Sequence, residues 1–147
     1  MSGVFSNVLC PLDFDSQSWS AMKIAQNALQ SGGRIRFLHL RRFPFALTPS
    51  EAEVPLAESK ERLETMVRRA LGPDVAYDIS VESSDDVAGS IIRHAHDMHA
   101  DCIVLATHAR RGVEKILLGS IAEQVIRDAP CPVLTIARPG ISAATAP

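Results

Sequence analysis

The fold is decided by residues 101–120, which read Asp-Cys-Ile-Val-Leu-Ala-Thr-His-Ala-Arg-Arg-Gly-Val-Glu-Lys-Ile-Leu-Leu-Gly-Ser. The stretch begins as a short apolar strand, continues through a basic loop and ends at a Gly-Ser pair that opens a helix. Backbone N–H groups converge at such a junction, and the helix dipole favours negative charge there. The stretch therefore predicts a place that can hold a phosphate.

Outward from this stretch, strands and helices alternate four times and a fifth strand closes the order. The expected strands are 5–12, 34–40, 75–81, 102–106 and 133–137, and the expected helices are 16–31, one ending near 71, one from 84–86 to about 98, and 119–128. This alternation predicts an α/β fold, a three-layer, doubly wound, Rossmann-like sheet of five parallel strands. Strand 75–81 alternates in polarity, so we expect it at an edge.

The length and composition fit one domain, residues 1–138, with a tail, 139–147, that has nothing to bury and is expected to be disordered. The formal net charge of −2 does not suggest a nucleic-acid partner. No apolar run approaches the roughly 18 residues of a membrane span, and the first residues lack the pattern of a signal peptide. We therefore expect a cytoplasmic protein without a membrane partner.

Neither a metal site nor a catalytic site is expected. The three cysteines, Cys10, Cys102 and Cys131, are far apart and lie in or beside apolar strands, which favours reduced core thiols. The histidines of residues 94–99 are expected at the surface or its boundary, because about 100° of helical rotation per residue leaves only His96 and His99 on one face. No nucleophile motif accompanies any histidine.

The basic loop after the fourth strand is the first candidate for an anion site. Arg110, Arg111 and Lys115 oppose a single acid, Glu114, although a solvated surface loop has the same composition. Ser120-x-x-Glu123 predicts a capping box at the start of the next helix, which accounts for the serine without a ligand. Both interpretations of the serine stay open, because a hydroxyl can turn from the cap to a phosphate.

Asp13 is the candidate for the other end of a ligand. It follows the first strand, where a carboxylate can accept hydrogen bonds from a ribose or a base amine. It can also serve the turn before the first helix, a role that Asp15 and Ser16 fill equally well. If the first and fourth strands are neighbours, Asp13 and the loop after Ala106 meet at the point where the strand order reverses.

Four segments together closely resemble the universal stress protein family: 8–13 (Val-Leu-Cys-Pro-Leu-Asp), 37–40 (Phe-Leu-His-Leu), 100–108 (Ala-Asp-Cys-Ile-Val-Leu-Ala-Thr-His) and 117–134. The resemblance implies an adenine nucleotide alpha hydrolase-like sheet with the first and fourth strands adjacent, a homodimer paired through the last strand and, in one branch, bound ATP. The apolar segment 132–137 is compatible with such a paired edge.

In the ATP-binding branch the phosphate loop reads Gly-x2-Gly-x9-Gly-Ser/Thr, and here its positions are Ala106, Ala109, Gly119 and Ser120. The resemblance implies that Asp13 contacts the adenosine, and the full set of implied nucleotide-binding residues is Pro11, Asp13, Leu40, Ala106, His108, Ala109, Arg110, Gly119, Ser120 and Ile121. The methyl group of Ala106 mainly narrows the pocket. A left-handed backbone at Ala109 costs about 1–2 kcal/mol, which arginine contacts can offset.

The resulting hypothesis is a stress-response module that binds ATP, with Mg²⁺, or a related adenine nucleotide, and acts as a sensor or switch. The alternative is a nucleotide-free homodimeric interaction module of the same family, which the two alanines favour. Slow ATP hydrolysis, with Asp13 near Mg²⁺, is a third interpretation, and an efficient enzyme is not expected.

Overall fold

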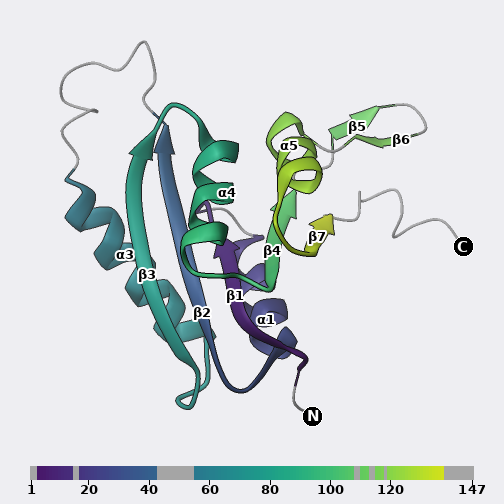
Figure 1. Ribbon diagram of the computed structural model, residues 1–147. Coiled ribbons are helices and arrows are strands. Elements are labelled where there is room, and N and C mark those ends of the chain that lie inside the picture. The colour runs from purple at the N-terminus through teal and green to yellow at the C-terminus, as the bar shows by residue number, and fades with distance from the viewer. Residues whose placement is uncertain are drawn as a thin grey trace, which may run out of the picture.

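Five parallel strands form the central sheet of the computed structural model (Figure 1). The structure describes residues 3–14, 17–42, 55–107, 110–112, 115–117 and 119–137. The strands of the sheet are β1 (Phe5–Pro11), β2 (Leu29–Arg42), β3 (Ala76–Ser84), β4 (Cys102–Thr107) and β7 (Val133–Ala137). Their order is β3-β2-β1-β4-β7, which confirms the predicted fold, the edge position of β3 and the adjacency of β1 and β4.

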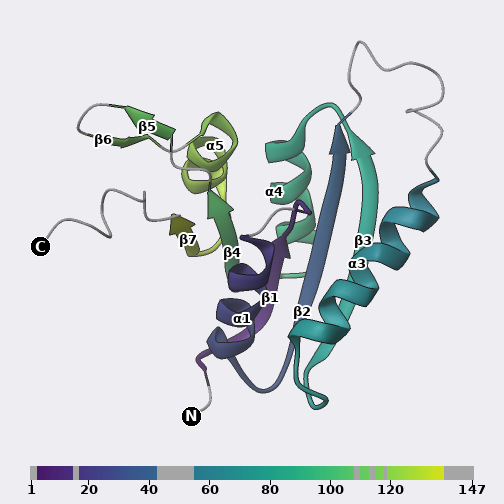
Figure 2. The same ribbon diagram turned by 180° about the vertical axis from the view of Figure 1, so that it is seen from behind.

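Two helices cover each face of the sheet. The helices α1 (Ser18–Ala28) and α3 (Leu56–Ala70) lie on one face, and α4 (Val87–Asp97) and α5 (Ser120–Asp128) lie on the other, as the two opposite views show (Figures 1 and 2). The three layers follow from the sequence order, because each strand-to-strand crossover carries its helix back over the sheet.

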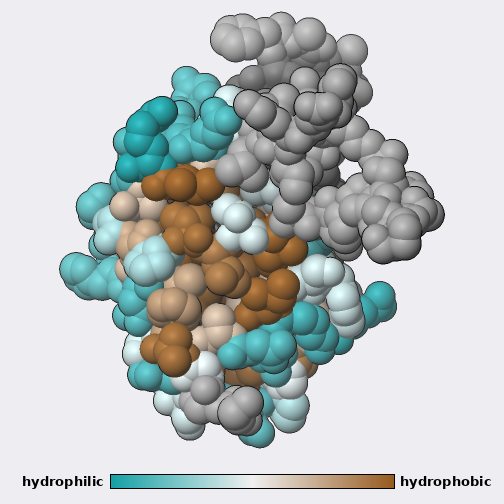
Figure 3. All heavy atoms as spheres, turned by 90° about the vertical axis from the view of Figure 1, so that its right-hand side faces the viewer, coloured by the Kyte–Doolittle hydropathy of each residue, from teal (hydrophilic) through white to brown (hydrophobic). Residues whose placement is uncertain are grey.

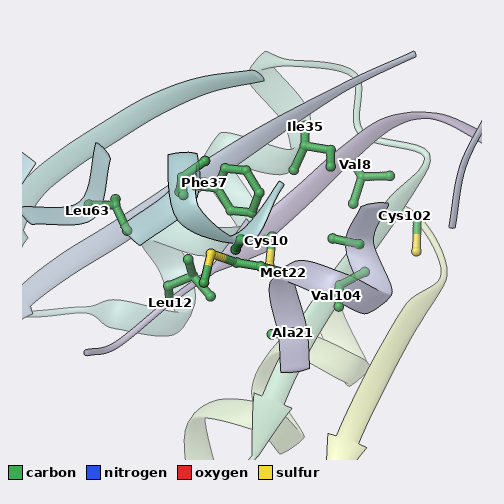
Figure 4. Packing of buried hydrophobic residues seen from close by; sticks show 13 residues of the cluster. Val8, Cys10, Leu12, Ala21, Met22, Ile35, Phe37, Leu63, Cys102 and Val104 are labelled. Atoms are coloured by element: carbon green, nitrogen blue, oxygen red, sulfur yellow. The ribbon is translucent and has the colours of Figure 1, made fainter. Parts of the chain in front are cut away.

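The strands bury side chains on both faces. In β1, Val8 and Cys10 belong to the core beneath α1 and α3, whereas Leu9 belongs to the core beneath α4 and α5, and all three have no exposed surface. Figure 4 shows Met22 of α1 pointing toward Cys10 in the first of these cores. Burial on both faces explains why β1 reads as a continuous apolar run rather than as an alternating one.

The first helix ends earlier than the sequence predicts. It ends at Ala28 instead of near Ser31, and the following residues already extend β2. The ladder between β1 and β2 shifts register here and becomes regular only at Arg34, the predicted start of the strand. Gly32 has a φ of +80° in this irregular segment, a conformation that glycine adopts readily, so Gly32-Gly33 marks a bulge after the helix.

The start of α1 also differs from the prediction. The helix begins at Ser18 with Gln17 as its N-cap residue, and the side chain of Gln17 makes no capping hydrogen bond. Residues 15 and 16, the predicted caps, lie outside the described residues. The same is true of 43–54, between β2 and α3, and of the predicted tail 139–147.

The position predicted for His94 is wrong. Its side chain is buried, because the i, i+3 spacing from Ile91 places it on the inward stripe of α4. Its Nε2 atom lies 3.3 Å from the Glu82 carboxylate of β3. Within the part of the chain that the structure describes, no group of three or more His, Cys, Asp or Glu side chains is arranged to hold a metal ion.

The cysteines are all free, as expected. Cys10 and Cys102 are buried, and Cys131 is half-buried. Burial raises the pKa of the Cys102 thiol to about 11 and raises the pKa of Cys10 further, so both thiols are poor nucleophiles. None of the described helices has the length and apolar character needed to cross a membrane.

Candidate functional site

A cleft of about 790 Å³ opens beyond the carboxyl ends of β1 and β4. The sheet continues from β1 to β2 in one direction and from β4 to β7 in the other, so the strand order reverses at this point. Doubly wound sheets bind ligands at such a position, and the volume is in the range of small-molecule sites. The lining residues are Pro11, Leu12, Asp13, Ser18, Leu38, Leu40, Val87, Ile91, Leu105, Ala106, Thr107, Gly119, Ser120, Ile121, Ala122 and Glu123.

The cleft brings together seven of the ten predicted site residues. They are Pro11, Asp13, Leu40, Ala106, Gly119, Ser120 and Ile121. His108 and Ala109 lie outside the described residues, and Arg110 begins the short strand β5 (Arg110–Gly112). The residues come from four separate parts of the chain, and the parallel packing of β2, β1 and β4 makes them neighbours.

The first wall of the cleft is the chain that leaves β1. The Leu12 N–H donates to the Leu38 carbonyl of β2 at 2.8 Å, which extends the ladder one residue beyond β1. The Ser18 hydroxyl of α1 then donates to the Asp13 carbonyl at 2.9 Å. The backbone on both sides of the Asp13 carboxylate is therefore tied to a neighbouring element.

The second wall is the amino end of α5, and its cap differs from the prediction. Gly119 is the N-cap residue and Ser120 is already helical, so the predicted capping box between Ser120 and Glu123 is wrong. The Glu123 N–H instead donates to the Gly119 carbonyl at 3.0 Å, as the first bond of the helix. The N–H groups of the three residues before it have no acceptor within the helix. All three residues line the cleft, so their N–H groups can donate hydrogen bonds to an anion there.

Gly119 has no structural reason to be glycine. Its φ of −65° and ψ of 160° are open to any residue, and a Cβ atom at this position would meet no atom within 4 Å among the described neighbours. The missing side chain leaves open space at the helix end. A ligand can therefore approach the backbone of α5 closely.

The described lining residues carry two carboxylates, Asp13 and Glu123, and include no lysine or arginine. The predicted basic residues lie on a small antiparallel hairpin between β4 and α5, formed by β5 and β6 (Lys115–Leu117) (Figure 1). The sequence predicts only a loop there, because strands of three residues are too short to show a period.

Sequence reasoning missed several residues of the cleft. Val87 and Ile91 of α4 face it, and their i, i+4 spacing is the signal that places them on one side of the helix. Ser18 and Thr107 also line it, and Thr107 directly follows the predicted end of its strand. The Thr107 hydroxyl donates to the Ile136 carbonyl of β7 at 3.5 Å.

The family model described as "Universal stress protein family" matches residues 5–137. The chain belongs to this family. A curated relative, universal stress protein MJ0531 of Methanocaldococcus jannaschii, is 31% identical over 145 residues, which cover 92% of this chain and 84% of the relative. The family resemblance that was read from the sequence is thereby confirmed.

Solved structures of other proteins share the fold of this universal stress protein. Hypothetical protein MJ0577 matches with a TM-score of 0.66 and 25% identity, over 92% of this chain and 97% of the other. A universal stress protein in complex with cAMP has a TM-score of 0.63 and 18% identity, over 92% and 98%. A universal stress protein of Archaeoglobus fulgidus in complex with dAMP has a TM-score of 0.61 and 14% identity, over 90% and 98%.

Proposed function

We propose that this universal stress protein binds an adenine nucleotide in the cleft between β1 and β4 and acts as a sensor or switch in the stress response. The observation that carries the proposal is the convergence of Asp13 and the amino end of α5 on one cleft of about 790 Å³. Relatives of the same fold in complex with cAMP and dAMP support the choice of an adenine nucleotide.

Each wall of the cleft has a role in this proposal. The Asp13 carboxylate accepts hydrogen bonds from the ribose or the base amine. Ser120 and Ile121 donate their N–H groups to a phosphate, and Gly119 leaves the space for it. The apolar side chains of Leu38, Leu40, Val87 and Ile91 suit the faces of a flat base.

The proposed ligand is ATP, with Mg²⁺ compensating its charge. Arg110, together with His108 and Ala109, surrounds the phosphates in this proposal, and Ala106 narrows the pocket beneath them. The working unit is the single domain of residues 1–138, acting in the cytoplasm. Slow hydrolysis is a weaker proposal, for which Asp13 is the acid near Mg²⁺.

The alternative is a nucleotide-free interaction module, which the alanines at 106 and 109 favour. The two functions separate in a simple experiment. The purified protein is heated, and the supernatant is chromatographed for released adenine nucleotide. A thermal-shift titration follows, in which ATP at about 100 times its Kd should stabilise the fold by roughly 2.7 kcal/mol. No released nucleotide and no shift with millimolar ATP and Mg²⁺ would contradict nucleotide binding.

Both functions include a homodimer paired through β7. This strand is the edge of the sheet beside β4, and the Leu134 side chain on it is 41% exposed. Figure 3 shows a broad hydrophobic band on the side of the molecule where β7 lies. An apolar edge of this kind is normally covered or paired.

Leu134→Lys tests the dimer by analytical ultracentrifugation. The charge is expected to shift the protein toward the monomer, because pairing would bury the lysine against the partner. Leu56→Lys on α3 is the matched control, since Leu56 is also 41% exposed but lies far from β7. If both variants keep the oligomeric state of the wild type, the dimer does not pair through β7.

A further inference from the structure

His39 of β2 holds the turn that carries Asp13, although it does not line the cleft. Its Nδ1 atom lies 2.8 Å from the Leu12 carbonyl oxygen. A carbonyl oxygen only accepts hydrogen bonds, so Nδ1 carries the proton and donates it. Leu12 is 6% exposed, and a buried carbonyl without a donor is costly. The imidazole thus supplies the hydrogen-bond donor for the Leu12 carbonyl, directly after the end of β1.

The imidazole ring is itself kept in place by a stack of side chains. The Phe14 ring lies against it, with 4.3 Å between the ring centroids and 48° between the planes. The Arg62 guanidinium of α3 lies over the Phe14 ring, 4.2 Å from its centroid. Such a cation over an aromatic face is attracted to it. The stack therefore links α3 to the turn through Phe14 and His39.

The stack and the cleft lie on opposite faces of the sheet. Phe14 packs against the core beneath α1 and α3, whereas Leu38 and Leu40, the neighbours of His39 on β2, line the cleft on the α4 side. A ligand in the cleft does not need to touch His39. Any influence of the imidazole on the ligand must pass through its two contacts with the turn, the Leu12 carbonyl and the Phe14 ring.

We propose that His39 is a positioning residue for the nucleotide cleft: its Nδ1–H fixes the Leu12 carbonyl, and Phe14 and Arg62 fix its ring, so that the Asp13 carboxylate faces the ligand. The Asp13 carbonyl is fixed independently by Ser18. Two hydrogen bonds, one from β2 and one from α1, thus hold consecutive carbonyl groups of the turn. The inference rests on the proposed nucleotide binding.

The test uses a pair of substitutions in the full chain. His39→Leu keeps an apolar contact for Phe14 but removes the donor, whereas His39→Asn places an amide nitrogen near the position of Nδ1. Loss of one buried hydrogen bond corresponds to about a tenfold change in affinity. We expect His39→Leu to bind ATP about tenfold more weakly by calorimetry, and His39→Asn to recover to within about threefold of the wild type.

Two results would overturn the inference. One is unchanged ATP affinity in His39→Leu, and the other is an equal loss in both variants, which would indicate packing rather than the hydrogen bond. Thermal denaturation of each variant establishes that the fold is intact. Arg62→Ala is expected to bind ATP about two- to threefold more weakly than the wild type. Arg69→Ala, which changes an exposed residue of the same helix, is the control. Equal ATP affinities of the two variants would show that Arg62 does not help to hold the ring.

A nucleotide-free measurement separates this inference from the proposed function. If the wild type binds no ATP, the proposed function fails, and the role of His39 is then read from amide hydrogen exchange. The Leu12 N–H, bonded to Leu38, should exchange faster in His39→Leu than in the wild type and stay protected in His39→Asn. Unchanged exchange in His39→Leu would overturn the positioning role itself.

Discussion

The two walls of the cleft are built in different ways. On the β1 wall, β2 and α1 hydrogen-bond to the turn around Asp13 and α3 supports it through the Phe14 stack. On the α5 wall, the helix begins at a glycine with no side-chain cap, and its first N–H groups face the cleft. In the proposed function, the fixed wall holds the nucleoside and the open wall receives the phosphates.

Gly119→Asp should have the largest effect, and it acts on the open wall. Aspartate is among the best N-cap residues, so α5 should keep or gain stability. A carboxylate in the cleft nevertheless repels a phosphate, and we expect ATP affinity to fall by at least about 100-fold. Calorimetry measures the affinity, and thermal denaturation measures the stability.

Gly119→Asn is the control for that substitution, because asparagine has nearly the same size and caps equally well but carries no charge. It should lose clearly less affinity than the aspartate variant. Equal binding by the two variants would mean that the phosphates do not approach α5.

Asp13→Asn should have the second-largest effect, and it acts on the fixed wall. The variant loses a charged acceptor, and hydrogen bonds to charged groups contribute about 1.5–3 kcal/mol. We expect ATP to bind about tenfold more weakly or worse, with a similar loss for adenosine, which has no phosphate.

Glu123→Gln is the matched control on the other wall. Its carboxylate lies in the first turn of α5, where negative charge competes with a phosphate, so its removal should leave ATP affinity unchanged or raise it. If the two substitutions changed affinity in the same direction and by the same amount, the walls would not differ in the proposed way.

Ala109→Gly should tighten binding by up to about tenfold. The expectation comes from the family pattern, in which this position is glycine, and from the cost of a left-handed backbone for alanine. Titration of the variant with ATP measures the change. Weaker binding would show that the backbone at this position is not left-handed in the complex.

Ala106→Gly should have the smallest effect on binding, less than about threefold. Ala106 lies within β4, where the methyl group only narrows the cleft. Glycine inside a strand lowers the free energy of unfolding by about 0.5–1 kcal/mol, so a lower melting temperature should accompany the small change in affinity. A change in affinity as large as that of Ala109→Gly would place Ala106 in contact with the ligand.

The fold could be predicted from the alternation of strands and helices, and much of the cleft lining could be predicted from the ends of the strands. Asp13 and Ala106 come directly after or at the end of apolar runs, and the carboxyl ends of neighbouring parallel strands meet at one edge. The cap of α5 could not be predicted from strand ends. Whether Ser120 caps α5 depends on where the helix begins, and a shift of one residue made Gly119 the cap.

The sequence by itself determined the alternation of strands and helices and the departures at Ala106 and Ala109, because these are local patterns. The tertiary structure alone decided that His94 is buried and that His39 reaches the Leu12 carbonyl. Those features depend on contacts between residues far apart in the chain, whose geometry emerges only when the layers pack.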